Sequence, residues 1–299
     1  MKHLLASLVL SALLGGTAQA QQERERERDN FGNLMPAIGA LDRGDFRQAI
    51  DSLLPFAREG GVEAQYVLGT VLETAPAPFR DLEAARDWYR RAAESGHPAA
   101  QNNLGAMFYD GRGALRNLVE AARWYRLAAD QGHPVAQTNL ALMLGAGLGA
   151  QPDPLEMAAL LQKAAAAGEP RAQAQLARLY LDGEGVTQNA TEAVKWFRDA
   201  ASQDHDDAQF FLAVLLQRGI GTARDFEASV AWFRRAAERG HALAMLELAK
   251  AYELGLGIAA DPAAAKTWRE RGREAAQAGK KAPAQPPGDQ RVDPRSPRR

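Results

Sequence analysis

The sequence predicts an all-α fold, a solenoid of stacked helical hairpins, from three observations. Tryptophans recur at multiples of 36 residues, paired glycines keep the same period, and no segment shows the alternation of a strand. The tryptophans are Trp88, Trp124, Trp196, Trp232 and Trp268, with Leu160 in the slot that lacks Trp. An array of small units presents a long surface rather than one catalytic pocket.

Residues 1–20 have the pattern of a cleaved signal peptide. Lys2 and His3 precede an apolar run from Leu4 to Leu14, and Ala18-Gln19-Ala20 fits the small-x-small cleavage rule. The apolar run is too short to span a bilayer, which takes about 20 residues. We therefore expect cleavage after Ala20 and a periplasmic or secreted protein.

Residues 21–43 form a charged linker and lead-in to the repeats. Glu and Arg alternate through Arg28, a composition that buries too little apolar surface to fold. The segment is either a recognition arm or a solvated linker, and we favour the linker.

The first helix of each repeat carries Ala and Leu four residues apart, which places both on one helical face. The six pairs are Ala64/Leu68, Ala100/Leu104, Ala136/Leu140, Ala172/Leu176, Ala208/Leu212 and Ala244/Leu248. A Gly or Ala follows each Leu, which predicts close approach of two helices. Gly-x-Gly pairs such as Gly111/Gly113 then predict a helix stop and a tight reversal.

The second helix of each repeat carries Ala and Trp at spacings of three and four, the apolar stripe of an amphipathic helix. It closes at a glycine, for example Gly96, with Asp204 as the exception. The tryptophans are predicted to be core residues rather than a stacking platform for sugars or bases.

These columns resemble the Sel1-like repeat, a relative of the tetratricopeptide repeat. The strings AAQNNLGAMFYDGRG (99–113) and EAARWYRLAADQGH (120–133) are similar to that family's consensus. The resemblance implies a right-handed α-solenoid over 44–278, with six hairpins and a final helix, whose first helices line a concave groove. The unit 152–187 has Leu160 for Trp and Glu169 for His, and we expect it to be the loosest joint.

Residues 279–299 form a Pro-rich basic tail that we expect to be disordered. Six basic residues against two acidic ones give it a local charge of +4. Weak contact with anionic envelope polymers and an inert solubilising role are both open.

The repeats offer little catalytic chemistry, and we predict no enzyme, no cofactor and no metal site. His97, His133, His205 and His241 share one column, but residues a repeat apart cannot converge on a metal; we interpret them as capping residues. The chain has no cysteine, hence no disulfide or thiolate. Some secreted Sel1-like proteins hydrolyse β-lactams, but their cysteine pairs and catalytic motifs are absent here.

The predicted partner site is the groove. The resemblance to tetratricopeptide arrays implies that variable positions of the first helices project into it, although each could be an ordinary solvated residue. The candidates are Tyr66, Asn102, Tyr109, Arg171, Arg178, Phe210, Gln217, Arg218 and Lys250. The aromatic residues are candidate anchors, and the arginines could bind carboxylates.

We therefore expect a monomeric, non-enzymatic scaffold that binds a protein or peptide partner in the cell envelope. With 36 basic and 37 acidic residues, the chain gives no reason to expect nucleic acid as a partner. It is most similar to cysteine-free periplasmic relatives that regulate sensor kinases controlling exopolysaccharide. The alternatives are an assembly factor for polysaccharide export or cell-wall machinery and, less favoured, a β-lactam or cell-wall hydrolase.

Overall fold

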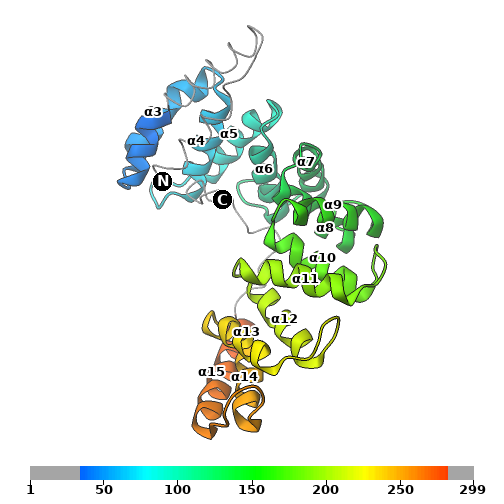
Figure 1. Cartoon of the computed structure of the whole chain (residues 1–299). Helices are drawn as coiled ribbons and strands as arrows, with labels where there is room; N and C mark the ends of the chain where they lie inside the picture. The colour runs from blue at the N-terminus through cyan, green and yellow to red at the C-terminus, as the bar shows by residue number, and fades with distance from the viewer. Residues whose placement is uncertain (1–33, 282–299) are drawn as a thin grey trace, which may run out of the picture. The chain divides into compact units, whose positions relative to one another are not determined.

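The computed structural model describes residues 34–281, and this range is all helical (Figure 1). The predicted signal peptide, most of the charged linker and residues 282–299 of the tail lie outside it. A helix over residues 34–42 precedes the labelled helices. These are α3 (Phe46–Arg58), α4 (Val62–Thr74), α5 (Leu82–Glu94), α6 (Pro98–Asp110), α7 (Leu118–Asp130), α8 (Pro134–Ala146), α9 (Pro154–Ala166), α10 (Pro170–Asp182), α11 (Ala190–Ser202), α12 (Asp206–Arg218), α13 (Phe226–Glu238), α14 (Ala242–Leu254) and α15 (Pro262–Lys281).

Even-numbered helices from α4 to α14 carry the Ala/Leu pairs and are called A helices here; odd-numbered helices from α3 to α15 are called B helices. Within each unit, successive helices such as α4 with α5 and α10 with α11 pack against each other as consecutive hairpins, which confirms the predicted fold class. None of these helices is long and apolar enough to cross a membrane.

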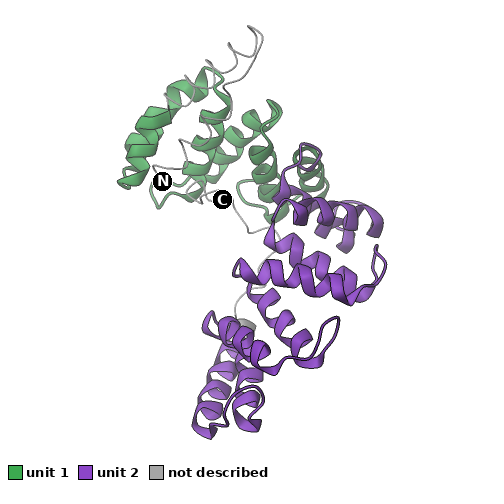
Figure 2. Ribbon diagram, in the orientation of Figure 1, with its two compact units in different colours: residues 1–128, 288–299 green, residues 129–287 purple. Residues whose placement is uncertain are grey.

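The chain divides into two compact units (Figure 2). The described residues fall into them as 34–128 and 129–281. The boundary between the units therefore lies outside the segment 152–187, in which we expected the loosest joint.

The turns of the repeat use the backbone freedom that the glycines predict. A helices such as α6 and α12 end at a left-handed glycine, Gly111 and Gly219, whose N–H bonds back to the last turn. The B helices from α3 to α13 are followed by a glycine with positive φ, except that Asp204 occupies this position after α11, with a φ of 62°. Within residues 34–281, Asp204 is the one residue other than glycine with a positive φ. Short polar side chains tolerate this region better than most others.

The B helices begin at a second column of caps. In each, an Asp or Asn side chain accepts the backbone N–H of the residue three positions later, which satisfies an otherwise unpaired donor. The capping residues are Asp45, Asp81, Asn117, Asp153, Asn189, Asp225 and Asp261.

The core is built around the aromatic residue that follows four of the five tryptophans. Tyr89, Tyr125, Phe197 and Phe233 are fully buried, whereas only Trp124 among the tryptophans is buried; the other four are half-buried. Each tryptophan ring lies under a cationic side chain, as Arg91 lies 4.5 Å from the Trp88 ring centre. The tryptophans therefore lie at the edge of the core, between the buried aromatic residues and the solvent-exposed cations.

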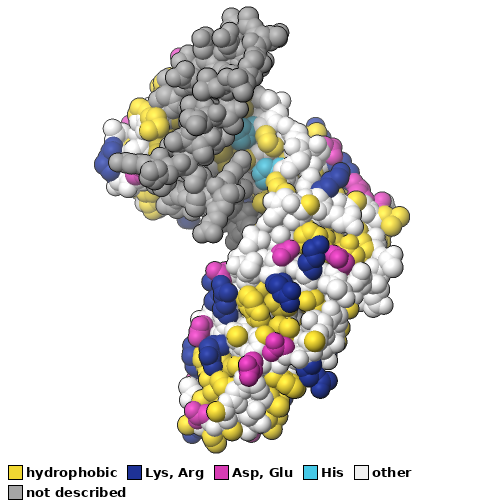
Figure 3. Space-filling view, viewed as in Figure 1, with side chains coloured by type: hydrophobic (Ala, Val, Ile, Leu, Met, Phe, Trp, Pro, Cys, Tyr) yellow, Lys and Arg dark blue, Asp and Glu magenta, His cyan; other side chains and the backbone are white. Residues whose placement is uncertain are grey.

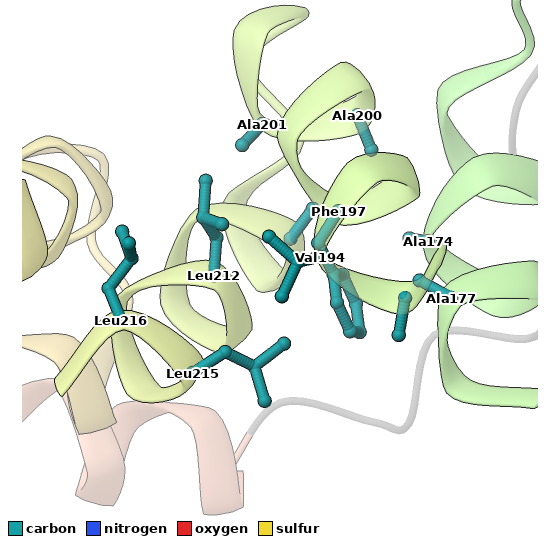
Figure 4. Close-up of a cluster of buried hydrophobic side chains, with 11 residues drawn as sticks. Ala174, Ala177, Val194, Phe197, Ala200, Ala201, Leu212, Leu215 and Leu216 are labelled. Atoms are coloured by element: carbon teal, nitrogen blue, oxygen red, sulfur yellow. The ribbon is translucent and has the colours of Figure 1, made fainter. Parts of the chain in front are cut away.

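The small residue after each core Leu marks the close approach that the sequence predicts. A Cβ on Gly69 would lie 2.7 Å from the ring of Tyr89, and one on Gly105 would lie 2.9 Å from the ring of Tyr125. In the second unit Phe197 packs among Ala174, Ala177 and Leu212 (Figure 4). The residue after the core Leu is Ala where the aromatic residue packed on it is Phe197, and Gly where that residue is Tyr89 or Tyr125.

Candidate partner-binding face

Each A helix from α6 to α14 begins with a side chain that caps it. In four of them a histidine Nδ1 accepts the N–H of the alanine three residues later, as His97 does for Ala100 at 3.1 Å. In α10 a carboxylate oxygen of Glu169 accepts the N–H of Ala172 instead. The capping interpretation of the histidine column is thus confirmed, and Glu169 serves the same purpose.

The same capping side chain also joins its helix to the preceding A helix. The His97 Nε2 lies 3.0 Å from the Glu63 carboxylate, and its ring stacks on Tyr66 at 4.5 Å. Four repeats later, His241 Nε2 lies 3.3 Å from Asp207 and its ring stacks on Phe210 at 4.7 Å. We call this arrangement the cap joint.

The cap joint varies in chemistry but not in place. Glu169 accepts a hydrogen bond from Thr138 Oγ1 at 3.0 Å, where the joints of His97 and His241 have stacked rings. The hydrogen bond from His241 lowers the pKa of Asp207 below its ordinary range. His97 and His241 contact the second and fifth residues of the preceding A helix, and Glu169 contacts the fifth.

Five of the predicted groove residues are engaged in contacts within the chain or are buried. Tyr66 and Phe210 stack on the cap histidines, and Arg171 donates to Asn139 Oδ1 at 3.2 Å. Asn102 is 1% exposed and Tyr109 is 6% exposed, so both are buried. Their use as partner contacts stays a prediction, and their local packing explains their presence without one.

The other four predicted residues lie in the second unit with more of their surface free. Arg178, Arg218 and Lys250 are exposed and Gln217 is half-buried. The three cations belong to a stripe formed by the second, sixth, ninth and thirteenth residues of α10, α12 and α14, which we call the outward stripe. Leu243 and Leu254 belong to it too and are 56% and 62% exposed. Figure 3 shows basic, acidic and apolar side chains interspersed on the second unit.

A buried column of glutamines was not recognised in the sequence, although it repeats every 36 residues. The side-chain Nε2 of each donates to a carbonyl oxygen in the last turn of the preceding B helix at 3.0–3.2 Å. The glutamines are Gln65, Gln101, Gln137, Gln173 and Gln209, and Met245 occupies the next position. This column is structural and closes the turn between B and A helices.

The first unit contains a buried polar cluster around Glu73. Its carboxylate accepts a hydrogen bond from Tyr89 Oη at 2.8 Å and pairs with Arg112, which also contacts Asp110. Burial, and then the charge of Glu73, raise the pKa of Tyr89 well above its ordinary value. Arg112 pairs with both carboxylates, and its contact with Glu73 links neighbouring repeats.

The described residues contain no group of three or more His, Cys, Asp or Glu side chains placed to hold a metal ion. A depression of about 340 Å³ on α3 is lined by Asp45, Arg47, Gln48, Asp51 and Ser52. The Ser52 hydroxyl donates to the Gln48 carbonyl, and no histidine lines this depression to act as its base. The absence of enzymatic activity stays a prediction.

The chain belongs to the Sel1 repeat family, since the repeat pattern that defines the family matches residues 62–97, 98–133, 134–169, 170–205, 206–241 and 242–275. Each match comprises one A helix and the B helix that follows it. Among curated proteins, none matches the sequence significantly.

Two solved structures of Sel1-type proteins are similar to most of the chain. A Sel1 repeat protein from Oxalobacter formigenes is 30% identical, with a TM-score of 0.72, over 85% of this chain and 99% of that one. A protective antigen present in uropathogenic Escherichia coli strains is 29% identical, with a TM-score of 0.75, over 87% of this chain. The match covers 56% of that antigen's chain.

Proposed function

We propose that this protein is a non-catalytic scaffold that binds a protein or peptide partner on the outward stripe of its second unit. Membership of the Sel1 repeat family supports a role in protein interaction. The observation that carries the proposal is the exposure of Leu243 and Leu254 on the same stripe as the exposed Arg218 and Lys250. Apolar side chains next to arginine are the usual composition of a binding surface.

We further propose that the scaffold acts in the cell envelope, as a regulator of signalling. The basic start, the apolar run and the Ala18-Gln19-Ala20 motif of the sequence support export. Sequencing the N-terminus of the protein recovered from the periplasm tests this step. We expect the mature chain to begin at Gln21, and a chain that retains Met1 in the cytoplasm would contradict export.

The binding face can be tested by placing a photocrosslinking amino acid at single positions of the full chain. We expect adducts with an envelope protein from position 243 or 254 on α14. Leu155 is the matched control because it is 74% exposed but lies on the B helix α9. Equal recovery of the same partner from position 155, or no adduct from any position, would contradict the proposed face.

A further inference from the structure

Two cations of the outward stripe, Arg178 and Arg218, form no ion pair within the described part of the chain. Both are exposed, and both belong to A helices, α10 and α12. Elsewhere in this unit, arginines such as Arg235 and Arg239 contact aspartates of a neighbouring helix or loop.

Most acids on the same face are already engaged. Asp207 contacts His241, Glu247 contacts Lys250, and Glu253 contacts Arg269. Asp182 is the exposed acid of the stripe that has no ion pair among residues 129–281. Arg178 and Arg218 thus have no carboxylate in ion-pair contact within 129–281, although the charge of Arg178 acts on Asp207.

Arg178 and Arg218 lie on A helices of neighbouring repeats, and α10 and α12 both pack against α11. The charge of Arg171 acts on His205, and that of Arg178 acts on Asp207 at the start of α12. Packed helices lie about 10 Å apart, and an extended chain advances about 3.3 Å per residue. We therefore expect carboxylates several residues apart in one peptide to meet both guanidinium groups.

The surface near the arginines is partly apolar. Phe211 and Val214 of α12 belong to the same stripe and are half-buried. A guanidinium group binds a carboxylate through two parallel hydrogen bonds, and an apolar surround strengthens them by excluding water. A segment that combines acidic and apolar residues fits both features.

We propose that the partner segment held on this stripe is an acidic peptide, whose carboxylates bind Arg178 and Arg218 while its apolar side chains cover Phe211 and Val214. This inference rests on the proposed function, since it names the chemistry of the partner at the same face. It also assigns Asp182 an opposing role, because its carboxylate repels the same ligand.

The test uses the full chain and a labelled peptide with a repeated Glu-Leu-Gly motif, followed by fluorescence anisotropy. Peptides with Gln or Lys in place of Glu separate charge from apolar contact. We expect the Glu peptide to bind about tenfold more tightly than the Gln peptide, with weaker binding still for Lys. Binding of the Glu peptide should also weaken as salt is raised.

Variants then locate the contact. Arg178→Gln and Arg218→Gln should each weaken binding of the Glu peptide about fivefold, and Asp182→Asn should strengthen it by a similar factor. Arg198→Gln is the matched control, because Arg198 is exposed on the B helix α11. Circular dichroism checks that each variant keeps its helical content.

Equal affinity for the Glu and Gln peptides, or equal loss in Arg198→Gln, would overturn the acidic-peptide assignment. Tighter binding of alginate, a carboxylated polysaccharide, than of the Glu peptide would overturn it as well. Each of these results leaves the crosslinking test of the scaffold unaffected. A partner captured at position 243 through a basic segment would sustain the proposed function and refute this inference.

Discussion

Gln173 donates from its buried side-chain amide to the carbonyl oxygen of Ala165, at 3.2 Å across the turn between α9 and α10. Its own side-chain oxygen accepts a hydrogen bond from Gln203 at 2.8 Å. One side chain thus fixes the start of an A helix to the helix before it and to the loop that follows α11. The same donor recurs in five repeats, which makes its contribution measurable at several equivalent sites.

Gln173→Ala should lower the free energy of unfolding by about 1–3 kcal/mol, because buried hydrogen-bonding groups lose their partners. Urea unfolding followed by circular dichroism measures this change. Gln175→Ala is the control, since Gln175 lies on the same helix, is half-buried and has no side-chain hydrogen bond in the structure. A loss as large in Gln175→Ala would show that the buried amide has no special role.

His241→Ala should destabilise the second unit by about 1–2 kcal/mol through loss of the cap on Ala244, together with the Asp207 contact. His241→Asn restores a capping oxygen without the stacked ring, so it should recover part of the loss. Hydrogen exchange at the Ala244 amide reports the cap directly. Equal protection of this amide in His241→Ala and the parent would refute the capping role.

His205 makes stability depend on pH near neutrality. Burial lowers its pKa below the ordinary value of 6.5, against the opposing charges of Asp207, Glu169 and Asp206. Because the unfolded chain binds the proton more readily, stability is complete above about pH 6.5 and decreases as the pH falls through that value toward the lower folded pKa. His205→Asn should show a weaker decrease between pH 7 and 5.5, measured by urea unfolding at each pH.

Asp207 gives a second and separate window. Its pKa is lowered below the ordinary 3.8, mainly by the hydrogen bond from His241. The contribution of Asp207 to stability is therefore present above that value and is lost only in stronger acid.

The His205 prediction has its own contradicting outcome. If His205→Asn lost stability between pH 7 and 5.5 as steeply as the parent, a group other than His205 would cause the pH dependence.

Gly221→Ala should destabilise the protein by about 2–4 kcal/mol. Gly221 has a φ of 68°, and an added Cβ would lie 2.2 Å from the carbonyl oxygen of Ala190. Gly240→Ala separates strain from collision, because its φ is 101° but no atom lies within 4 Å of an added Cβ. We expect the smaller loss there, and equal losses would show that backbone strain alone matters.

The sequence predicts the fold well because every turn, core Leu and cap repeats in phase. The glycine stops, the exception at Asp204 and the capping histidines are all found as expected. The tryptophans are less buried than the sequence predicts. The pattern shows only that the tryptophan position and the next one are apolar, and packing decides that Tyr89 is buried more deeply than Trp88. The looseness expected of the unit 152–187 stays a prediction, and Glu169 within it caps α10 as the histidines cap their helices.

The candidate site is harder to predict from the sequence. Variable positions such as Tyr66 and Phe210 are typical of ligand contacts, yet they stack on the histidine of the next repeat. That contact joins residues 31 apart, and a period alone does not reveal it. Arg178 and Arg218 remain as candidates because both are exposed and neither forms an ion pair with another described residue.

The cap joint also bears on how such a chain can change in length. Glu169 and His205 each accept the N–H of the third residue of the helix they begin, Ala172 or Ala208. If residues 170–205 were excised, Glu169 would precede α12 and face Ala208 with the same geometry. Whole repeats can thus be lost or duplicated with every type of contact preserved, whereas a deletion of any other length puts the caps, glycines and glutamines out of phase together.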